Sequence, residues 1–270
     1  MPDRPARSDQ PDRPARPARS RGARRIVRRV GVVALAAGVL AAVGFVIWAE
    51  HPMQAEAQPL ARVRADPLLT YRDEGAAVVL TPTRPTGTGL VFVSGARVDA
   101  AAYAWKLSGI VDRGVSVVIV RPTLDFAIFD TRALSSFERF DPQVRRWLVG
   151  GHSLGGVRAC QYAADAKGSG TLGGLVLLGS YCAADLSKSG LPVLSIGGTR
   201  DGLSTPSKIA AARHLLPSDA RMVEIPGAVH GQFGDYGTQP GDGTPTTTDA
   251  AVRTAITADV LAFLTDPATD

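Results

Sequence analysis

A short stretch of this 270-residue sequence places one serine among closely spaced glycines. The stretch VGGHSLGG covers residues 149–156, and Ser153 lies between Gly151 and Gly155. Glycine at these two positions suits a strand-to-helix turn that is too tight for side chains. Such a turn would leave the Ser153 hydroxyl accessible to a substrate. A plain glycine-rich loop is the alternative. The apolar run before the serine and the helical run after it favour the tight turn, with a nucleophile beside a helix N-terminus that favours negative charge.

A serine hydroxyl is a poor nucleophile at neutral pH and needs a general base. His152 adjoins the serine, so its side chain is expected to point elsewhere and pack under the turn. His214, in ARHLLPSD, is expected on a helix face. His230, in IPGAVHGQFGDYG, lies in a loop just after the last predicted strand. That loop reaches the sheet edge that carries Ser153, so His230 is the predicted base.

An orienting carboxylate is predicted at Asp201, which follows a strand in LSIGGTRDGLS. The chain order Ser153, Asp201, His230 is one of the known orders for a triad of serine, acid and histidine. Asp185 is a weaker candidate for this carboxylate. Asp235 and Asp242 lie too close to His230 in the sequence to hold it from behind, so they are expected to be turn residues.

Attack on a carbonyl puts negative charge on its oxygen, and that charge needs N–H donors. One donor is predicted at the backbone of Leu154, just after the nucleophile. The other is expected from the loop VSGARVD, at Ala96 or Gly95. Ala96 is preferred, with Gly95 providing the bend.

From residue 76 onward, apolar runs alternate with helical stretches. The β-branched and leucine runs lack polar alternation, which indicates strands buried on both faces. The predicted strands cover residues 76–80, 90–94, 115–120, 146–150, 175–179, 193–197 and 222–225. The predicted helices cover residues 100–112, 133–140, 154–166, 207–215 and 249–264. This order implies right-handed crossovers, so the expected fold is a three-layer α/β domain with a mostly parallel sheet over residues 76–270.

With these motifs the chain resembles the α/β-hydrolase fold superfamily. More narrowly, it is similar to a family of membrane-anchored bacterial α/β-hydrolases. The similarity is carried by GHSLGG, GLVLLGSYCAADLS, LSIGGTRDGL and HGQFGDYGTQPGDG, of which the last is the most specific. The resemblance implies a serine hydrolase and supplies no known substrate.

Only about a dozen residues lie between Gly179 and Leu191, where many relatives of the fold insert a cap domain. An open cleft buries a long acyl chain poorly, so a small or exposed ester is the expected substrate. The chemistry is that of a carboxylesterase and needs no cofactor. The alternative is a non-catalytic, anchored binding protein built on a hydrolase scaffold.

The first 48 residues predict a membrane anchor. Residues 1–29 contain ten Arg and three Asp, a net charge of +7 within a chain total of +5, so the remainder carries −2. This proline-rich tail is expected to be disordered, and it lacks the aromatic residues that would favour nucleic-acid binding. Residues 30–48 are uncharged and, at about 1.5 Å per residue, match the thickness of a bilayer core. The positive tail should stay cytoplasmic, which leaves the hydrolase domain outside the cell membrane.

A cleaved signal peptide is the alternative, because Ala55-Glu56-Ala57 matches a small-x-small cleavage site. The long apolar run and the long basic region before it favour an uncleaved, single-pass anchor. Residues 49–75 are then expected to form a connector with little regular structure.

Two cysteines, Cys160 and Cys182, fall in the exported part, where a disulfide is permitted. Cys160 is expected inside a helix and Cys182 after a strand, and nothing in this arrangement makes them face each other. Two buried free thiols are therefore predicted. No Cys/His cluster indicates a metal site.

Overall fold

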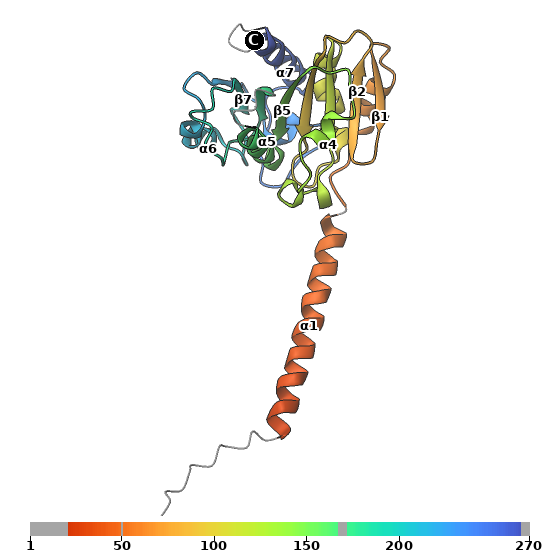
Figure 1. The fold of residues 1–270 in the computed structure, drawn as a ribbon, viewed down its shortest axis with the longest axis vertical. Coiled ribbons are helices and arrows are strands. Elements are labelled where there is room, and N and C mark those ends of the chain that lie inside the picture. The colour runs from red at the N-terminus through yellow and green to blue at the C-terminus, as the bar shows by residue number, and fades with distance from the viewer. Residues whose placement is uncertain (1–20, 50, 167–171, 266–270) are drawn as a thin grey trace, which may run out of the picture. The chain divides into compact units, whose positions relative to one another are not determined.

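The computed structural model describes residues 21–49, 51–166 and 172–265, and the chain divides into two compact units, residues 1–46 and residues 47–270. The larger unit is built around an eight-stranded sheet of order β1-β2-β4-β3-β5-β6-β7-β8 (Figure 1). Its strands are β1 Leu69–Asp73, β2 Ala77–Pro82, β3 Thr88–Val93, β4 Val115–Val120, β5 Arg146–His152, β6 Leu172–Leu178, β7 Val193–Gly198 and β8 Arg221–Ile225. Its helices are α2 Ala57–Arg64, α3 Ala104–Val111, α4 Ser135–Glu138, α5 Leu154–Asp165, α6 Pro206–Ala211 and α7 Asp249–Leu264, with short 3₁₀ turns between them.

The sheet is parallel from β4 to β8, and β1 and β2 join it antiparallel at one edge. Strand β4 illustrates why the central strands are continuous apolar runs, because all six of its residues are buried. Val117 and Ile119 enter the core that contains residues of α3 and α7. Val118 and Val120 enter the core that contains residues of α5. A strand covered on both faces carries mostly apolar side chains, and β4 does so at every position except Ser116, so the predicted three-layer α/β fold is confirmed.

The segment expected to be an irregular connector contains helix α2 and strand β1. Val63 of α2 and Leu69 of β1 are buried in the same core as α3 and α7. Strand β1 extends the sheet by pairing antiparallel with β2. Both elements were missed because each is short and mostly exposed, so neither shows a full apolar period.

The expectation that there is no room for a cap is confirmed. Residues 179–192, between β6 and β7, form neither helix nor strand. The carboxyl edge of the sheet is therefore not covered by an inserted domain at this crossover.

The prediction of two free thiols is wrong, because Cys160 and Cys182 form a disulfide with a Cα–Cα distance of 5.5 Å. The loop after β6 folds back over α5, and the Ser180 hydroxyl donates to the Ser153 carbonyl at 2.7 Å. Ser180 lies directly against Gly156. Cys182 is two residues beyond Ser180 and Cys160 is one helical turn beyond Gly156, so the two cysteines meet on the same helix face.

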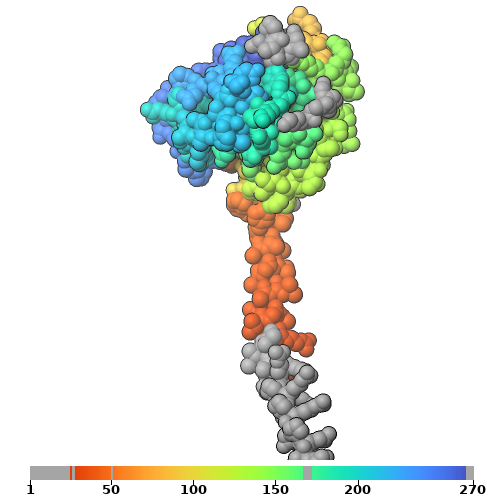
Figure 2. Space-filling model, turned by 60° about the vertical axis from the view of Figure 1, so that its left-hand side comes forward, coloured from red at the N-terminus to blue at the C-terminus, as the bar shows by residue number. Residues whose placement is uncertain are grey.

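Helix α1, Arg21–Ala49, is the only described part of the smaller unit and continues into the larger one. Its segment Arg28–Ala49 has a mean hydropathy of 2.7 and is long enough to cross a membrane. A signal sequence near the N-terminus can have the same length and hydropathy. Its apolar side chains are exposed, with 72% of Leu40 and 68% of Val33 accessible. Figure 2 shows this helix as a narrow column in orange.

We expect loss of the disulfide to lower the free energy of unfolding of the full chain by about 3 kcal/mol, because it closes a loop between residues 22 apart. Denaturant unfolding of a Cys160→Ser/Cys182→Ser variant in detergent measures this loss. Reductant should lower the wild type to the same value and leave the variant unchanged. Two reactive thiols in denatured, unreduced wild type would contradict the pairing.

Candidate active site

Ser153 lies at the sharp turn between β5 and α5. Its backbone has φ 53° and ψ −125°, a combination that a non-glycine residue rarely adopts. The turn requires glycine on both sides, because a Cβ at Gly155 would overlap the carbonyl of Val93 and a Cβ at Gly151 would overlap the backbone of Gly155. The strained turn follows the last residue of β5, at the carboxyl end of the sheet, as the spacing of glycines predicts.

His230 and Asp201 are paired at the same edge of the sheet. His230 Nδ1 lies 2.8 Å from Asp201 Oδ2, and both side chains are almost completely buried. The other oxygen of Asp201 accepts from the amides of Leu203 and Ser204, at 2.8 and 2.7 Å. These contacts fix the carboxylate, which in turn fixes the plane of the imidazole ring.

The second ring nitrogen of His230, Nε2, is buried and makes no hydrogen bond to any described residue. The Ser153 hydroxyl likewise makes no hydrogen bond among the described residues. Such contacts between a base and its nucleophile are often long in a site without ligand and tighten when substrate binds. The structure thus places a buried histidine nitrogen without a hydrogen-bond partner in the loop after β8, and a serine directly after β5, both at the carboxyl edge of the sheet.

The other candidates for base and acid, His214 and Asp185, are exposed, unlike this buried pair. His214 is exposed, and its Nδ1 contacts the Ala211 carbonyl at 2.9 Å. Asp185 is also exposed, and it accepts from the amide and hydroxyl of Ser187.

His152 is buried beneath the turn, as expected. Its Nδ1 lies 2.9 Å from the Tyr103 hydroxyl, and its ring centroid is 4.4 Å from that of His230. Burial lowers the pKa of His152 well below its usual value, and the neighbouring His230 acts in the same direction. His152 is therefore neutral at pH 7, so the ring that packs against His230 carries no charge.

The two predicted sources of the second N–H donor differ in their surroundings. The Gly95 amide donates to the Tyr103 hydroxyl at 2.9 Å. Burial raises the pKa of Tyr103 far above its usual range, so the phenol keeps its proton and can still donate to His152. The amides of Ala96 and Leu154 make no hydrogen bond to described residues, and Leu154 occupies the first position of α5, where an amide has no partner within the helix.

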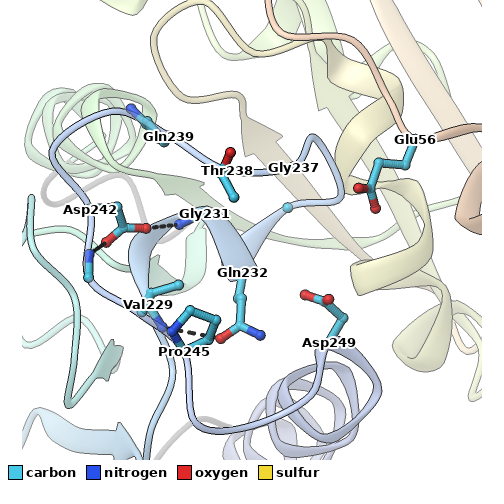
Figure 3. Close-up of a pocket in the computed structure, with 12 residues that line it drawn as sticks. Glu56, Val229, Gly231, Gln232, Gly237, Thr238, Gln239, Asp242, Pro245 and Asp249 are labelled. Carbon is cyan, nitrogen blue, oxygen red and sulfur yellow. Dashed lines mark hydrogen bonds between the residues drawn. The ribbon is translucent and has the colours of Figure 1, made fainter.

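Asp242, which the sequence suggested only as a turn residue, holds the two loops of the pair together. Its Oδ1 accepts from the amides of Gly202, His230 and Gly243, and its Oδ2 accepts from Gly231 at 2.8 Å. Figure 3 shows the carboxylate directed at the turn of Gly231. Burial alone would raise the pKa of Asp242, but these four amides outweigh it and lower the pKa. No side-chain pattern in the sequence signals this role, because all four partners are backbone groups.

A second buried carboxylate fixes the far end of the same loop. Asp235 Oδ1 lies 2.9 Å from Nζ of Lys106, a completely buried residue of α3. Burial raises the pKa of Asp235 to about 6, although the Lys106 ammonium acts against this. The contact between Asp235 and Lys106 anchors the loop to the helix layer.

A pocket opens behind His230 and not over Ser153. It is lined by the neighbours of His230, Val229 and Gly231, and by the side chains of Glu56, Thr238 and Asp249 among others (Figure 3). Ser153 is not among its lining residues. In the described part of the chain, no group of three His, Cys, Asp or Glu side chains is arranged to hold a metal ion.

Residues 89–254 match the family model described as alpha/beta hydrolase family. This segment covers more than half of the chain and includes Ser153, Asp201 and His230. No protein with a curated description matches the sequence.

Solved structures share the fold at low sequence identity. Est1E from Butyrivibrio proteoclasticus has a TM-score of 0.51 at 13% identity, over 73% of this chain and 99% of its own. TT1662 from Thermus thermophilus has a TM-score of 0.50 at 15% identity, over 73% and 99%. A structure titled as a bacterial membrane phospholipase A has a TM-score of 0.53 at 16% identity, over 90% and 99%.

We expect Asp242→Asn to lower the free energy of unfolding at pH 7 by about 2 kcal/mol, because an amide cannot accept from four N–H groups as a carboxylate does. The folded pKa lies below 3.8, so the advantage of the wild type should be complete above about pH 5 and shrink as the pH falls through the folded pKa. Denaturant unfolding at several pH values measures it. Asp185→Asn is the matched control, and an equal loss in both variants would contradict the role of Asp242.

Proposed function

Because this chain belongs to the alpha/beta hydrolase family, we propose that it is a serine hydrolase, with carboxylic esters as its substrates. In this proposal Ser153 is the nucleophile, His230 the general base and Asp201 the residue that orients His230. Leu154 and Ala96 supply the N–H donors for the oxyanion. The coarser conclusion, that the protein is a hydrolase, follows from the family itself.

One observation carries the proposal: a serine in a strained strand-to-helix turn shares a sheet edge with a buried Asp–His pair. The 2.8 Å contact between Asp201 and His230 Nδ1 holds the proton of the ring on that nitrogen. The opposite nitrogen, Nε2, is then left as an acceptor. An acceptor of this kind is what a serine hydroxyl needs when it attacks.

The first half of the reaction forms an acyl-enzyme. The Ser153 oxygen attacks the ester carbonyl while its proton moves to His230 Nε2. The carbonyl oxygen becomes negative and is stabilised by the amides of Leu154 and Ala96, together with the N-terminus of α5. The C–O bond to the alcohol then breaks, and His230 returns the proton to the departing oxygen.

The second half releases the acid. A water molecule gives a proton to His230 Nε2 and attacks the acyl carbon through the same oxyanion. The bond to Ser153 breaks, the serine oxygen takes the proton back, and a carboxylic acid leaves. Asp201 stays ionised throughout and stabilises the imidazolium formed in each half.

A non-catalytic binding protein on the same scaffold is the alternative function. It would have no need of a serine held at positive φ, because such backbone strain costs on the order of 1–3 kcal/mol and occurs mainly where it has a role. A fluorophosphonate probe separates the two functions, since it labels a serine only when a base activates it.

We further propose that the enzyme is anchored in the cell membrane. In this arrangement residues 1–29 are cytoplasmic, residues 30–48 span the bilayer, and the hydrolase domain of residues 76–270 lies outside. The alternative cleavage site at Ala55-Glu56-Ala57 is part of the folded unit, because the Glu56 amide donates to the Asp235 carbonyl and α2 begins at Ala57. That integration supports an uncleaved chain.

We expect Ser153→Ala to reduce hydrolysis of p-nitrophenyl acetate on the order of 10⁶-fold and to abolish fluorophosphonate labelling, with the fold unchanged by circular dichroism. His230→Ala should cause a similar loss, whereas His214→Ala, the matched control, should not. The Ser153→Ala/His230→Ala variant should be no slower than either single variant, because the two residues act as a unit. Normal turnover by Ser153→Ala would exclude the proposed mechanism.

Asp242→Asn should leave fluorophosphonate labelling possible but slow kcat by roughly tenfold to a hundredfold, because it loosens the backbone that positions His230. Asp185→Asn again serves as the control. A change in KM with constant kcat would indicate that Asp242 acts on substrate binding instead of alignment.

The topology predicts that the protein keeps its full mass and resists alkaline extraction from membranes. Protease added to intact cells should digest the hydrolase domain, because the arginines before residue 30 keep the N-terminus inside. A soluble product beginning at Gln58 would indicate a cleaved signal peptide. A domain spared in intact cells and digested only after lysis would reverse the orientation.

A further inference from the structure

The end of the apolar helix is joined to the loop that carries the proposed oxyanion donor. The guanidinium of Arg97 lies 3.9 Å from the ring centre of Trp48, and it donates to the His51 carbonyl at 2.8 Å. The Met53 amide donates to the Arg97 carbonyl at 2.7 Å, and Met53 bridges Val98 in parallel. All these residues belong to the unit of residues 47–270. Since Arg97 follows Ala96, the last residues of the apolar segment are fixed at the catalytic edge of the sheet.

The next loop along this edge exposes large apolar side chains beside Trp48. The ring of Phe126 is 5.8 Å from that of Trp48, and the ring of Phe129 is 6.0 Å from that of Phe126. Ile128 is 63% exposed and Phe129 is 42% exposed. Outside α1, the other large hydrophobic residues of comparable exposure in the described chain are Leu68 and Met222.

We propose that Trp48, Phe126, Ile128 and Phe129, here called the Trp48 patch, contact the lipid bilayer. We propose also that Ser153 takes amphiphilic esters from that surface. The occupant is lipid because the patch is continuous with an apolar segment that ends at Ala49, one residue after Trp48. Tryptophan is enriched at the membrane interface, and phenylalanine occurs on the lipid-facing side of interfacial helices. The assignment of substrate rests on the proposed hydrolase function, whereas the contact with lipid does not.

This arrangement explains how an uncapped site could act on a long-chain ester. Residues 179–192 form no lid that could bury an acyl chain. A bilayer beside the patch would keep the chain in lipid, and the site would need to reach only the ester group at headgroup depth. The substrate class is therefore an ester with an apolar tail anchored in the membrane.

The contact is tested on the full-length chain in vesicles of phosphatidylcholine and phosphatidylglycerol. An Ile128→Cys variant carries a single reactive thiol, because Cys160 and Cys182 are joined, and it is labelled with bimane. Lipid spin-labelled near the headgroup should quench this label strongly and should leave a label at Met222→Cys on β8 unquenched. No quenching at residue 128 would overturn the proposal. A shift in the bimane emission without quenching would also overturn it, because a second copy of the protein would then cover the patch in place of lipid.

The substrate class is tested with the variant Ile128→Gln/Phe129→Gln and two esters. Hydrolysis of vesicle-embedded 4-methylumbelliferyl oleate should fall about tenfold, while hydrolysis of soluble p-nitrophenyl acetate should not change. Leu68→Gln/Met222→Gln is the matched control and should retain both activities. Equal loss of both activities in the patch variant, or loss of neither, would overturn the assignment. Failure of the wild type to hydrolyse either ester would instead contradict the proposed function and leave the quenching result standing.

Discussion

The backbone at Ser153 is the constraint on which the rest of the site depends. Its φ of 53° and ψ of −125° are unfavourable for serine, and they persist only because several contacts with the surrounding chain hold the backbone in place. Glycines on both sides let β5 and α5 approach closely, Ser180 bonds the serine carbonyl, and the disulfide fixes the following loop to α5. The other non-glycine residues with positive φ in the described chain are Arg97, Leu124 and Asp125. They follow β3 and β4, so the strained positions all gather at one edge of the sheet.

Carboxylates organise the opposite half of the site through the backbone. Asp201 accepts two amides besides the histidine ring, and Asp242 accepts four. Asp235 adds a buried ion pair with Lys106. Loops after parallel strands have no ladder partners of their own, and charge-assisted hydrogen bonds to their N–H groups replace the missing partners. The His230 imidazole is thereby positioned by carboxylates that act mainly on the backbone of its own and the neighbouring loop.

The sequence was sufficient for features that depend on local pattern. The buried strands follow from apolar runs, the Ser153 turn from glycine spacing, and the neighbouring positions of Asp201 and His230 from their places after parallel strands. Features that depend on packing between distant segments were missed or misjudged. The disulfide arises from how one loop folds over α5, Asp242 acts on backbone groups that leave no trace in side-chain types, and α2 and β1 each bury too few residues to show a period.

The parallel bridge between Met53 and Val98 shows that the folded domain begins before helix α2. Trp48, His51 and Met53 are part of the folded unit, because each of them contacts the loop after β3. A soluble form truncated at residue 57 would remove the chain that covers Arg97, while the sheet and the Asp–His pair would remain intact. Such a protein would keep its sheet and yet would have lost the contacts that hold the loop after β3. Polar substitutions within residues 30–46 would remove the exposed apolar surface of α1 and keep these contacts.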